Sequence, residues 1–214
     1  MSESIALNID CMEYMATLPD KAFDLAIVDP PYGLGSAVVN SGGRFARYKH
    51  EGGNWDMETP KKEYFSELVR VSKNQIIWGG NYFELPPTKC FLIWDKKQPE
   101  DVSFASCEFA WTSFTRTAKT FYYSPMMDKS RFHPTQKPVA LYEWLLTNYA
   151  KEGDRILDTH LGSGSSRIAA YNLGFDFVGC EIDKEYFDKQ EERFARHTAQ
   201  TSLFVEGFDE QSLL

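Results

Sequence analysis

The segment Phe23-Asp24-Leu25-Ala26-Ile27-Val28-Asp29-Pro30-Pro31-Tyr32-Gly33 is an apolar run that stops abruptly at two prolines. The run predicts a buried strand, and neither a strand nor a helix continues freely through two prolines, because each fixes φ and lacks an N–H. The chain must therefore turn and present Asp29 and Tyr32 at the carboxyl end of the strand, the edge at which ligands bind in open α/β sheets. A carboxylate beside an aromatic ring suits a planar nitrogenous base, since the carboxylate accepts from an amino group while the ring stacks.

Composition limits the class of protein. A chain of 214 residues is long enough for one well-buried α/β domain. Its formal charge of −8 argues against a uniformly basic surface, so any contact with nucleic acid must come from local basic clusters. The four cysteines include no Cys-x-x-Cys pair, which disfavours a metal knuckle or a disulfide framework. No apolar run approaches the roughly 20 residues that cross a bilayer, and the N-terminus lacks a signal-like core, so we expect a cytoplasmic protein.

The chain before the Asp-Pro-Pro-Tyr corner predicts a β-α-β unit. Residues Ser4–Ile9 read as a short strand that ends at Asp10-Cys11, and Met12–Leu18 read as a helix. Asp10 and Asp29 are therefore expected at the same edge of the sheet. An aspartate after a strand is also a common helix N-cap, and this alternative stays open for Asp10.

A glycine-rich, irregular stretch follows the corner, over residues 33–56. An irregular segment of this length inside a compact domain is usually functional or disordered. It carries basic and aromatic side chains that can neutralise phosphates and stack against bases, namely Arg44, Arg47, Tyr48, Lys49 and His50. We predict a mobile loop that faces DNA, with a solvated loop of no binding role as the alternative.

The middle of the chain predicts one helix and several strands. The helix covers Lys61–Val71, with Thr59 as its N-cap and Pro60 at its first position. The predicted strands cover Asn74–Trp78 and Cys90–Trp94, followed by a hairpin-type pair over Cys107–Thr115 and Lys119–Tyr123.

A second β-α-β unit lies near the C-terminus, after a helix from Val139 to about Ala150. A strand over Arg155–Leu157 ends at Asp158, a glycine turn leads into a helix from Ser165 to about Leu173, and a strand over Phe177–Cys180 ends at Glu181. Glu181 comes 19 positions after Gly162. This is close to the roughly 20-residue spacing that brings a carboxylate to a ribose hydroxyl, so the unit predicts a nucleoside site.

The glycine turn narrows the choice of nucleoside. The dinucleotide fingerprint requires a third glycine where this chain has Arg167, and the chain has no Walker-type phosphate loop. A diphosphate cofactor is therefore disfavoured. S-adenosylmethionine, which has no phosphate, fits better, with backbone amides near Gly162 and Gly164 facing its carboxylate. A single Gly-x-Gly turn is also found as a simple helix cap, and this alternative stays open.

Three motifs together resemble the amino-group DNA methyltransferases: Asp29-Pro30-Pro31-Tyr32, His133-Pro134-Thr135-Gln136-Lys137-Pro138, and Asp158 with the turn Gly162-Ser163-Gly164. Their order is similar to that of the circularly permuted β subgroup, and the resemblance covers about residues 4–197. It implies a Rossmann-like α/β fold with a mixed, mostly parallel sheet of seven strands and helices on both faces. The methyltransferase domain would cover residues 1–197 with no separate target-recognition domain, followed by a tail over 198–214.

The resemblance implies transfer of a methyl group from S-adenosylmethionine to the N6 amino group of an adenine flipped out of DNA. The corner Asp29-Pro30-Pro31-Tyr32 would hold the base: Asp29 and the Pro30 carbonyl would accept from the amino group, and Tyr32 would stack on the ring. Asp in the first position is typical of adenine-N6 enzymes, whereas Ser is commoner in cytosine-N4 enzymes. No metal or covalent nucleophile is required.

The resemblance also places the cofactor against a set of residues from several segments. These are Asp10, Cys11, Asp29, His133, Thr135, Lys137, Asp158, Thr159, His160, Gly162, Ser163, Gly164, Ser165 and Glu181. Thr159 and His160 depart from the Asp-Pro-Phe that usually opens this turn in the family, so His160 is expected only as a turn residue that caps the site.

Several alternatives remain at this stage. A similar corner serves enzymes that methylate cytosine N4, RNA or a protein amide. An alternative that is not an enzyme is an inactive subunit that binds the cofactor and DNA. Dimers are common in the subgroup, so a homodimer is one expectation.

The tail segment Gln200-Thr201-Ser202-Leu203-Phe204 resembles the pentapeptide by which bacterial replication proteins dock onto the sliding clamp. We predict that it is extended, with packing on the domain or on a dimer partner as the alternative to clamp docking.

Overall fold

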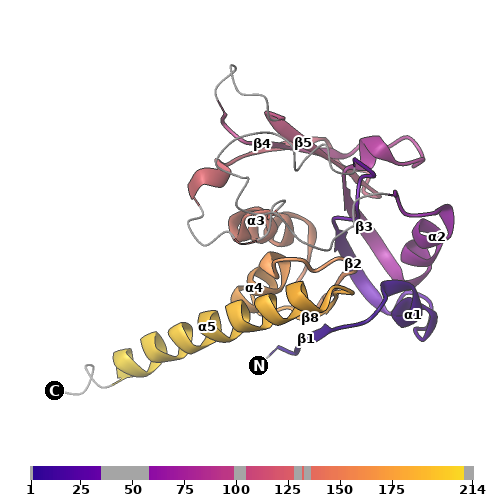
Figure 1. The fold of residues 1–214 in the computed structure, drawn as a ribbon. Coiled ribbons are helices and arrows are strands. Elements are labelled where there is room, and N and C mark those ends of the chain that lie inside the picture. The colour runs from indigo at the N-terminus through magenta and orange to yellow at the C-terminus, as the bar shows by residue number, and fades with distance from the viewer. Residues whose placement is uncertain (1, 35–57, 99–104, 128–131, 133–135, 210–214) are drawn as a thin grey trace.

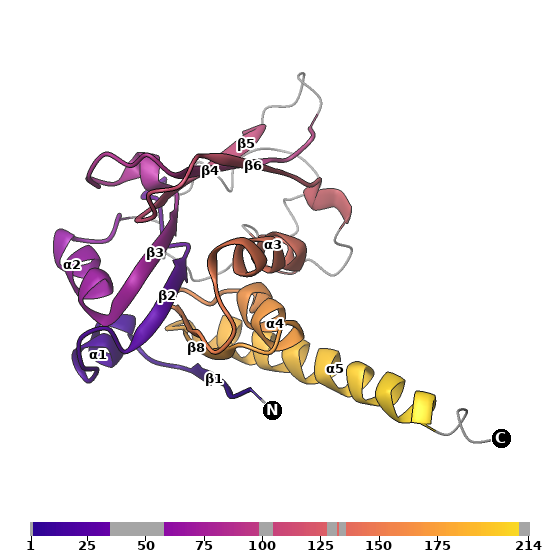
Figure 2. The same ribbon diagram turned by 180° about the vertical axis from the view of Figure 1, so that it is seen from behind.

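The computed structural model is a three-layer α/β fold, in which one mixed sheet lies between two layers of helices (Figure 1). It describes residues 2–34, 58–98, 105–127, 132 and 136–209, and the side chains of these residues up to residue 200. Helices α1 (Cys11–Ala16) and α2 (Lys62–Val71) cover one face of the sheet. Helices α3 (Val139–Tyr149), α4 (Ser165–Asn172) and α5 (Lys184–Asp209) lie on the other side (Figure 2).

The sheet has eight strands in the order β1-β8-β7-β2-β3-β5-β4-β6, one more than predicted. The strands are β1 (Ser4–Leu7), β2 (Phe23–Val28), β3 (Ser72–Trp78), β4 (Phe91–Asp95), β5 (Cys107–Thr112), β6 (Lys119–Tyr122), β7 (Arg155–Asp158) and β8 (Asp176–Cys180). Strands β1, β8, β7, β2 and β3 are mutually parallel, β5 is antiparallel to β3 and β4, and β6 is parallel to β4. The predicted mixed, mostly parallel sheet is confirmed.

Strand β2 lies at the centre of the sheet because its side chains are buried on both faces. Leu25 and Ile27 belong to the core on the side of α3, and Ala26 and Val28 belong to the core on the side of α1 and α2. A continuous apolar run of this kind is the pattern of a parallel strand covered by helices on both faces. Strand β2 pairs with β7 on one side and β3 on the other, so the corner that follows it lies where the two halves of the chain meet. Ligands bind at such switch points.

The predicted pairing of Cys107–Thr115 with Lys119–Tyr123 is wrong, because β4 lies between β5 and β6. A short connection alone predicts a hairpin, but side-chain packing decides otherwise. The ring of Phe121 in β6 packs on Trp144 of α3 at 5.3 Å, and the Trp94 indole donates to the Tyr123 carbonyl at 2.8 Å. These contacts hold β6 against the outer edge of β4.

Two expectations at helix ends are also wrong. Helix α2 begins at Lys62 with Lys61 as its N-cap, so Thr59 and Pro60 precede it and do not cap it. Helix α5 continues to Asp209, so the segment Gln200–Phe204 is helical and the predicted extended tail from residue 198 is wrong up to residue 209. No proline interrupts this stretch, and its first glycine is Gly207, so helix propensity favours continuation. Within the described ranges, none of the helices combines the length and apolar character that crossing a lipid bilayer requires.

Candidate active site

Four predicted acidic residues follow or end neighbouring parallel strands. Asp10 comes after β1, Glu181 after β8 and Asp29 after β2, while Asp158 is the last residue of β7. Because these strands run in the same direction, the four side chains are placed along one edge of the sheet. The sequence pattern of an apolar run that ends in an acid therefore located this edge.

Each carboxylate oxygen of Asp29 accepts a hydrogen bond from a neighbouring side chain. Its Oδ1 accepts from the Tyr32 hydroxyl at 2.5 Å, and its Oδ2 accepts from the Lys137 ammonium, whose Nζ also lies 3.3 Å from the Tyr32 hydroxyl. Only 2% of the Lys137 side chain and 17% of the Asp29 side chain are exposed. Burial raises the pKa of Asp29 above its ordinary value, and the Lys137 ammonium opposes this shift.

Glu108 of β5 and Lys96, after β4, extend this network, and the sequence did not predict either of them. The Lys137 Nζ lies 3.0 Å from Glu108 Oε2, and the Lys96 Nζ lies 2.8 Å from Glu108 Oε1. Burial disfavours the ionised carboxylate, but the two ammonium groups outweigh it and lower the pKa of Glu108 to about 2. Asp29, Lys137, Glu108 and Lys96 thus form a run of alternating charges, which we call the charge chain.

The ring of Tyr32 is held in place by β3 and the turn after it. It stacks on Tyr82 with ring centroids 4.9 Å apart and an interplanar angle of 16°. Gly79 approaches so closely that a Cβ there would lie 2.1 Å from a carbon of the Tyr32 ring, and its φ of +70° also favours glycine. Gly79 therefore determines where the Tyr32 hydroxyl meets Asp29.

The Asp158 carboxylate accepts hydrogen bonds from residues on both sides of the glycine turn. It is 2% exposed; its Oδ1 accepts from the His160 backbone N–H at 3.0 Å, and its Oδ2 accepts from the Ser166 hydroxyl at 2.5 Å. Burial raises the pKa of Asp158 to about 7, although both hydrogen bonds oppose the shift. The side chain supports the turn on which Gly162 and Gly164 lie, each with a positive φ.

Glu181 ties β8 to the same turn. Its Oε2 accepts from the Gly162 backbone N–H at 2.8 Å, and its Oε1 accepts from the Asp183 N–H at 2.9 Å. Burial raises the pKa of Glu181, and these backbone donors oppose the rise. The carboxylate is therefore held in one orientation, with a second lone pair on each oxygen left for a ligand hydroxyl.

His160 and Thr159 take part in a buried contact with α2. Thr159 Oγ1 shares a hydrogen bond of 2.9 Å with His160 Nδ1 and another of 2.6 Å with the Tyr64 hydroxyl. The Tyr64 and His160 rings meet edge to face at 5.4 Å. Burial lowers the pKa of His160 to about 4, so this residue presents a neutral imidazole at physiological pH.

A cavity of about 240 Å³ lies between the Asp29 corner and the glycine turn. Seven of the predicted site residues line it: Asp29, Pro31, Lys137, His160, Gly162, Ser163 and Glu181. The sequence missed Gln136, Tyr142, Leu161, Ile182, Asp183 and Tyr186, which also line it. Its carboxylates would repel a diphosphate and suit a cationic sulfonium, so the lining fits S-adenosylmethionine better than a dinucleotide.

Other predicted residues lie near this cavity but do not line it. The Asp10 side chain accepts from the Met12 N–H at 2.7 Å and caps α1, so the N-cap alternative is confirmed for Asp10. Cys11 opens the same helix, and burial raises the pKa of its thiol to about 12. Tyr32 and Asp158 support cavity residues, as described above. The predicted residues His133 and Thr135, and the loop residues Arg44, Arg47, Tyr48, Lys49 and His50, lie outside the described residues.

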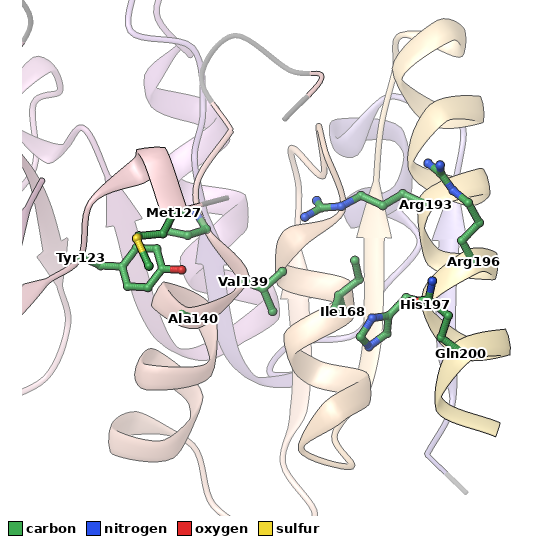
Figure 3. Close-up of a pocket in the computed structure, with 10 residues that line it drawn as sticks. Tyr123, Met127, Val139, Ala140, Ile168, Arg193, Arg196, His197 and Gln200 are labelled. Carbon is green, nitrogen blue, oxygen red and sulfur yellow. The ribbon is translucent and has the colours of Figure 1, made fainter. Parts of the chain in front are cut away.

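A second cavity, of about 600 Å³, is lined by residues of α3, α4 and α5 together with Tyr123 and Met127 (Figure 3). Val139, Ile168, Arg196 and His197 contribute to its walls. Arg193 of α5 also lines it and reaches the turn, donating to the Ser163 carbonyl at 2.8 Å and to the Ser165 hydroxyl at 2.9 Å. The long helix therefore supports the turn from behind.

A family model described as DNA methylase, of the N6/N4 type, matches residues 75–192, which include Glu108, Lys137, Asp158 and Glu181. The chain belongs to the N6/N4 DNA methylase family. The predicted family is thus confirmed. The activity that the family shows is that of a DNA amino-methyltransferase of the N6/N4 type. Among curated proteins, the Type II methyltransferase M2.DpnII of Streptococcus pneumoniae is 25% identical over 241 residues, covering 86% of this chain and 87% of that protein.

Solved structures share the fold of the methylase. The M1.HpyAVI complex with S-adenosylmethionine matches with a TM-score of 0.57 and 22% identity, over 88% of this chain and 98% of that one. The PvuII DNA methyltransferase, described as cytosine-N4-specific, matches with a TM-score of 0.61 and 14% identity, over 90% and 87% of the two chains. The first complex agrees with S-adenosylmethionine as the cofactor of this family.

Proposed function

We propose that the methylase transfers a methyl group from S-adenosylmethionine to the N6 amino group of an adenine flipped out of DNA. The observation that carries this proposal is the position of Asp29, which directly follows the central strand β2 and lines the cavity, with its carboxylate bonded to Tyr32. An aspartate at the first position of the corner favours adenine over cytosine by its resemblance to adenine-N6 enzymes. Residues from both halves of the chain meet at this point, Asp29 from the first half and Lys137 and Glu181 from the second.

The chemistry needs a nitrogen lone pair held in line with a methyl group. The bound cofactor supplies that methyl group on a positively charged sulfur. Asp29, aided by the Pro30 carbonyl, accepts the N–H groups of the target amine, which orients its lone pair toward the cavity. Transfer would form the new N–C bond as the methyl–sulfur bond of the bound cofactor breaks, with the electron pair left on sulfur. The surplus proton on nitrogen then leaves to water.

The cofactor pocket is assigned by the same reasoning. Glu181 would accept from the ribose hydroxyls, and the turn over residues 162–165 would face the methionine part of the cofactor, with Asp158 and Thr159 beneath it. His160 would border the pocket as a neutral ring. By the family resemblance, His133 and Thr135 would border the other flank of the cofactor together with Lys137, Asp10 would border its adenine, and Cys11 would also contact the cofactor.

Contacts with larger partners remain proposals. Arg44, Arg47, Tyr48, Lys49 and His50 would contact the DNA around the flipped base. A homodimer remains an expectation from the family resemblance. Clamp docking through Gln200–Phe204 would have to proceed from a helix, since the backbone of this segment belongs to α5.

The proposal is tested by incubating the purified protein with S-adenosylmethionine labelled in the methyl group and with bacterial DNA that carries no methylated bases. The DNA is then digested to nucleosides, and the label is identified by mass spectrometry. We expect the label in N6-methyl-2′-deoxyadenosine from the wild type. We expect a loss of about 10- to 100-fold for Asp29→Asn, because a charge-assisted hydrogen bond contributes about 1.5–3 kcal/mol.

The matched control is Asp20→Asn, an exposed aspartate before β2 at the opposite edge of the sheet. It should keep the activity of the wild type. Label recovered as N4-methylcytosine would refute the adenine assignment and retain the methyltransferase. Cofactor binding without transfer to DNA would instead favour the inactive subunit or another substrate, which parallel reactions with RNA and protein distinguish.

A further inference from the structure

In the described structure, the acceptor that the proposed reaction needs is already occupied. Asp29 Oδ1 receives the Tyr32 hydroxyl and Oδ2 receives the Lys137 ammonium. An ammonium and a target amino group are both N–H donors, and both compete for the same carboxylate oxygen. A base that approaches Asp29 through Oδ2 therefore competes with Lys137 for this oxygen, and its approach is favoured when Lys137 withdraws.

The charge chain provides a second anion for Lys137. Glu108 Oε2 lies 3.0 Å from the Lys137 Nζ, while Glu108 Oε1 is held by Lys96 at 2.8 Å. Lys137 also lies near the faces of two aromatic rings, 5.4 Å from the Trp78 centroid and 5.8 Å from the Tyr32 centroid, which favour a cation. A small movement toward Glu108 thus leaves the ammonium paired.

We propose that Lys137 is a place-holder for the target amino group, and that Glu108 is the carboxylate that receives Lys137 when the base enters. This inference rests on the proposed function, because it describes how Asp29 is kept ready for an amine. The four groups of the charge chain sum to no net charge, so the exchange moves a cation between two anions without leaving a charge unpaired.

The surroundings of Lys137 explain why a partner carboxylate is needed. Its side chain is only 2% exposed, so water cannot solvate the ammonium once it leaves Asp29. Burial opposes the ammonium, yet Asp29 and Glu108 together raise the pKa of Lys137, so the group remains charged throughout. Removing one partner of a buried ion pair is costly, since the other charge is left without compensation.

The first variant, Glu108→Gln, removes the receiving anion and keeps the shape of the side chain. Lys137 then has Asp29 as its one remaining carboxylate in the charge chain, and the base competes poorly for it. We expect kcat/KM for unmethylated bacterial DNA to fall at least about tenfold, while the Kd for S-adenosylmethionine, measured by calorimetry without DNA, stays within twofold. Glu108→Asp, which keeps the charge, should retain activity within about threefold of the wild type.

The decisive variant is the double substitution Glu108→Gln with Lys137→Met. It removes the competing ammonium along with its receiving anion, so no lysine competes with the base for Asp29. Because Lys137 no longer opposes the effect of burial on the pKa of Asp29, the rates are compared on the alkaline side of neutral pH, where Asp29 is ionised. We expect kcat/KM at least about fivefold above that of Glu108→Gln alone. If Lys137 only stabilised the fold or were itself required for transfer, the double variant would be no better than the single one.

A matched control is Glu191→Gln, which also removes a carboxylate from a buried cation, Arg167, at 2.7 Å but away from Asp29. It should leave kcat/KM unchanged within twofold. Wild-type activity in Glu108→Gln, an equal loss in Glu108→Asp, or no recovery in the double variant would each overturn the inference and leave the proposed function standing. A wild-type protein that transfers no methyl group to DNA would overturn both.

Discussion

Gly79 shows how a single residue sets the geometry of the candidate site. It follows the last residue of β3, and its backbone lies against the ring of Tyr32, whose hydroxyl donates to Asp29. Two separate demands meet here, a positive φ and a close approach. Gly153, in the turn before β7, also has a positive φ, but a Cβ there would meet nothing within 4 Å.

Gly79→Ala should therefore displace Tyr32, whereas Gly153→Ala should strain the backbone alone. We expect each variant to lose about 1–3 kcal/mol of unfolding free energy from the unfavourable φ, and only Gly79→Ala to lose about tenfold or more in methyl transfer. Urea unfolding and initial rates with labelled cofactor measure the two effects. Equal activity in both variants would show that the position of Tyr32 does not matter for transfer.

The acids of the site could be predicted from sequence because each follows an apolar strand. Asp29, Asp158 and Glu181 are local signals of this kind. Glu108 and Lys96 could not be predicted, since Lys96 meets Glu108 and Glu108 meets Lys137 only through the pairing of β4 with β5 and the placement of β5 beside β3. No spacing rule relates residues 96, 108 and 137, so the charge chain is a property of the folded sheet.

At the scale of elements, helix α5 does more than cover the sheet. Arg193 reaches from this helix to the backbone of the glycine turn and to Ser165, the first residue of α4. Arg196, one turn further along, is exposed, and its Nε bonds only weakly, at 3.4 Å, to the Glu192 carbonyl. The two arginines thus provide a test of whether the helix supports the turn.

Arg193→Met should weaken binding of S-adenosylmethionine by about tenfold, because the buried Ser163 carbonyl loses its donor and the turn loosens. Arg196→Met should bind the cofactor as the wild type does. Isothermal calorimetry on the two variants measures the difference directly. A common Kd for both would mean that the turn holds its shape without α5.

The elements also show where sequence reasoning stops. The β-α-β unit over β7, α4 and β8 was predicted within a few residues, because strong apolar runs and a glycine turn mark it. The position of β6 was not predicted. Strand β6 pairs in parallel with the outer edge of β4 because its side chains pack against α3, and the local sequence carries no signal of that packing. Helix α5 continues beyond residue 197, although the segment Gln200–Phe204 resembles a docking peptide that binds in an extended form, because no proline or early glycine stops the helix there.

At the scale of the whole molecule, charge is the main constraint on DNA binding. The formal charge is −8, and three of the carboxylates that contribute to it, those of Asp29, Glu181 and Asp183, line the cavity. A polyanion approaching this edge is repelled unless a local basic segment offsets the acids. The segment that follows the corner directly in sequence carries Arg44, Arg47 and Lys49.

Replacing Arg44, Arg47 and Lys49 together by Gln should therefore weaken DNA binding and flatten its dependence on salt. Each lost phosphate contact reduces the slope of log K against log salt by about 0.9, so the slope should fall by about two to three units. Fluorescence anisotropy with labelled duplex at several salt concentrations measures it, and the Kd for S-adenosylmethionine should not change. The control replaces Lys21, Lys73 and Lys151 by Gln. These lysines are exposed near the amino ends of β2, β3 and β7, at the opposite edge of the sheet. Both triple variants lower the net charge equally, so a slope that falls as much in the control would show that DNA senses overall charge and not the predicted loop.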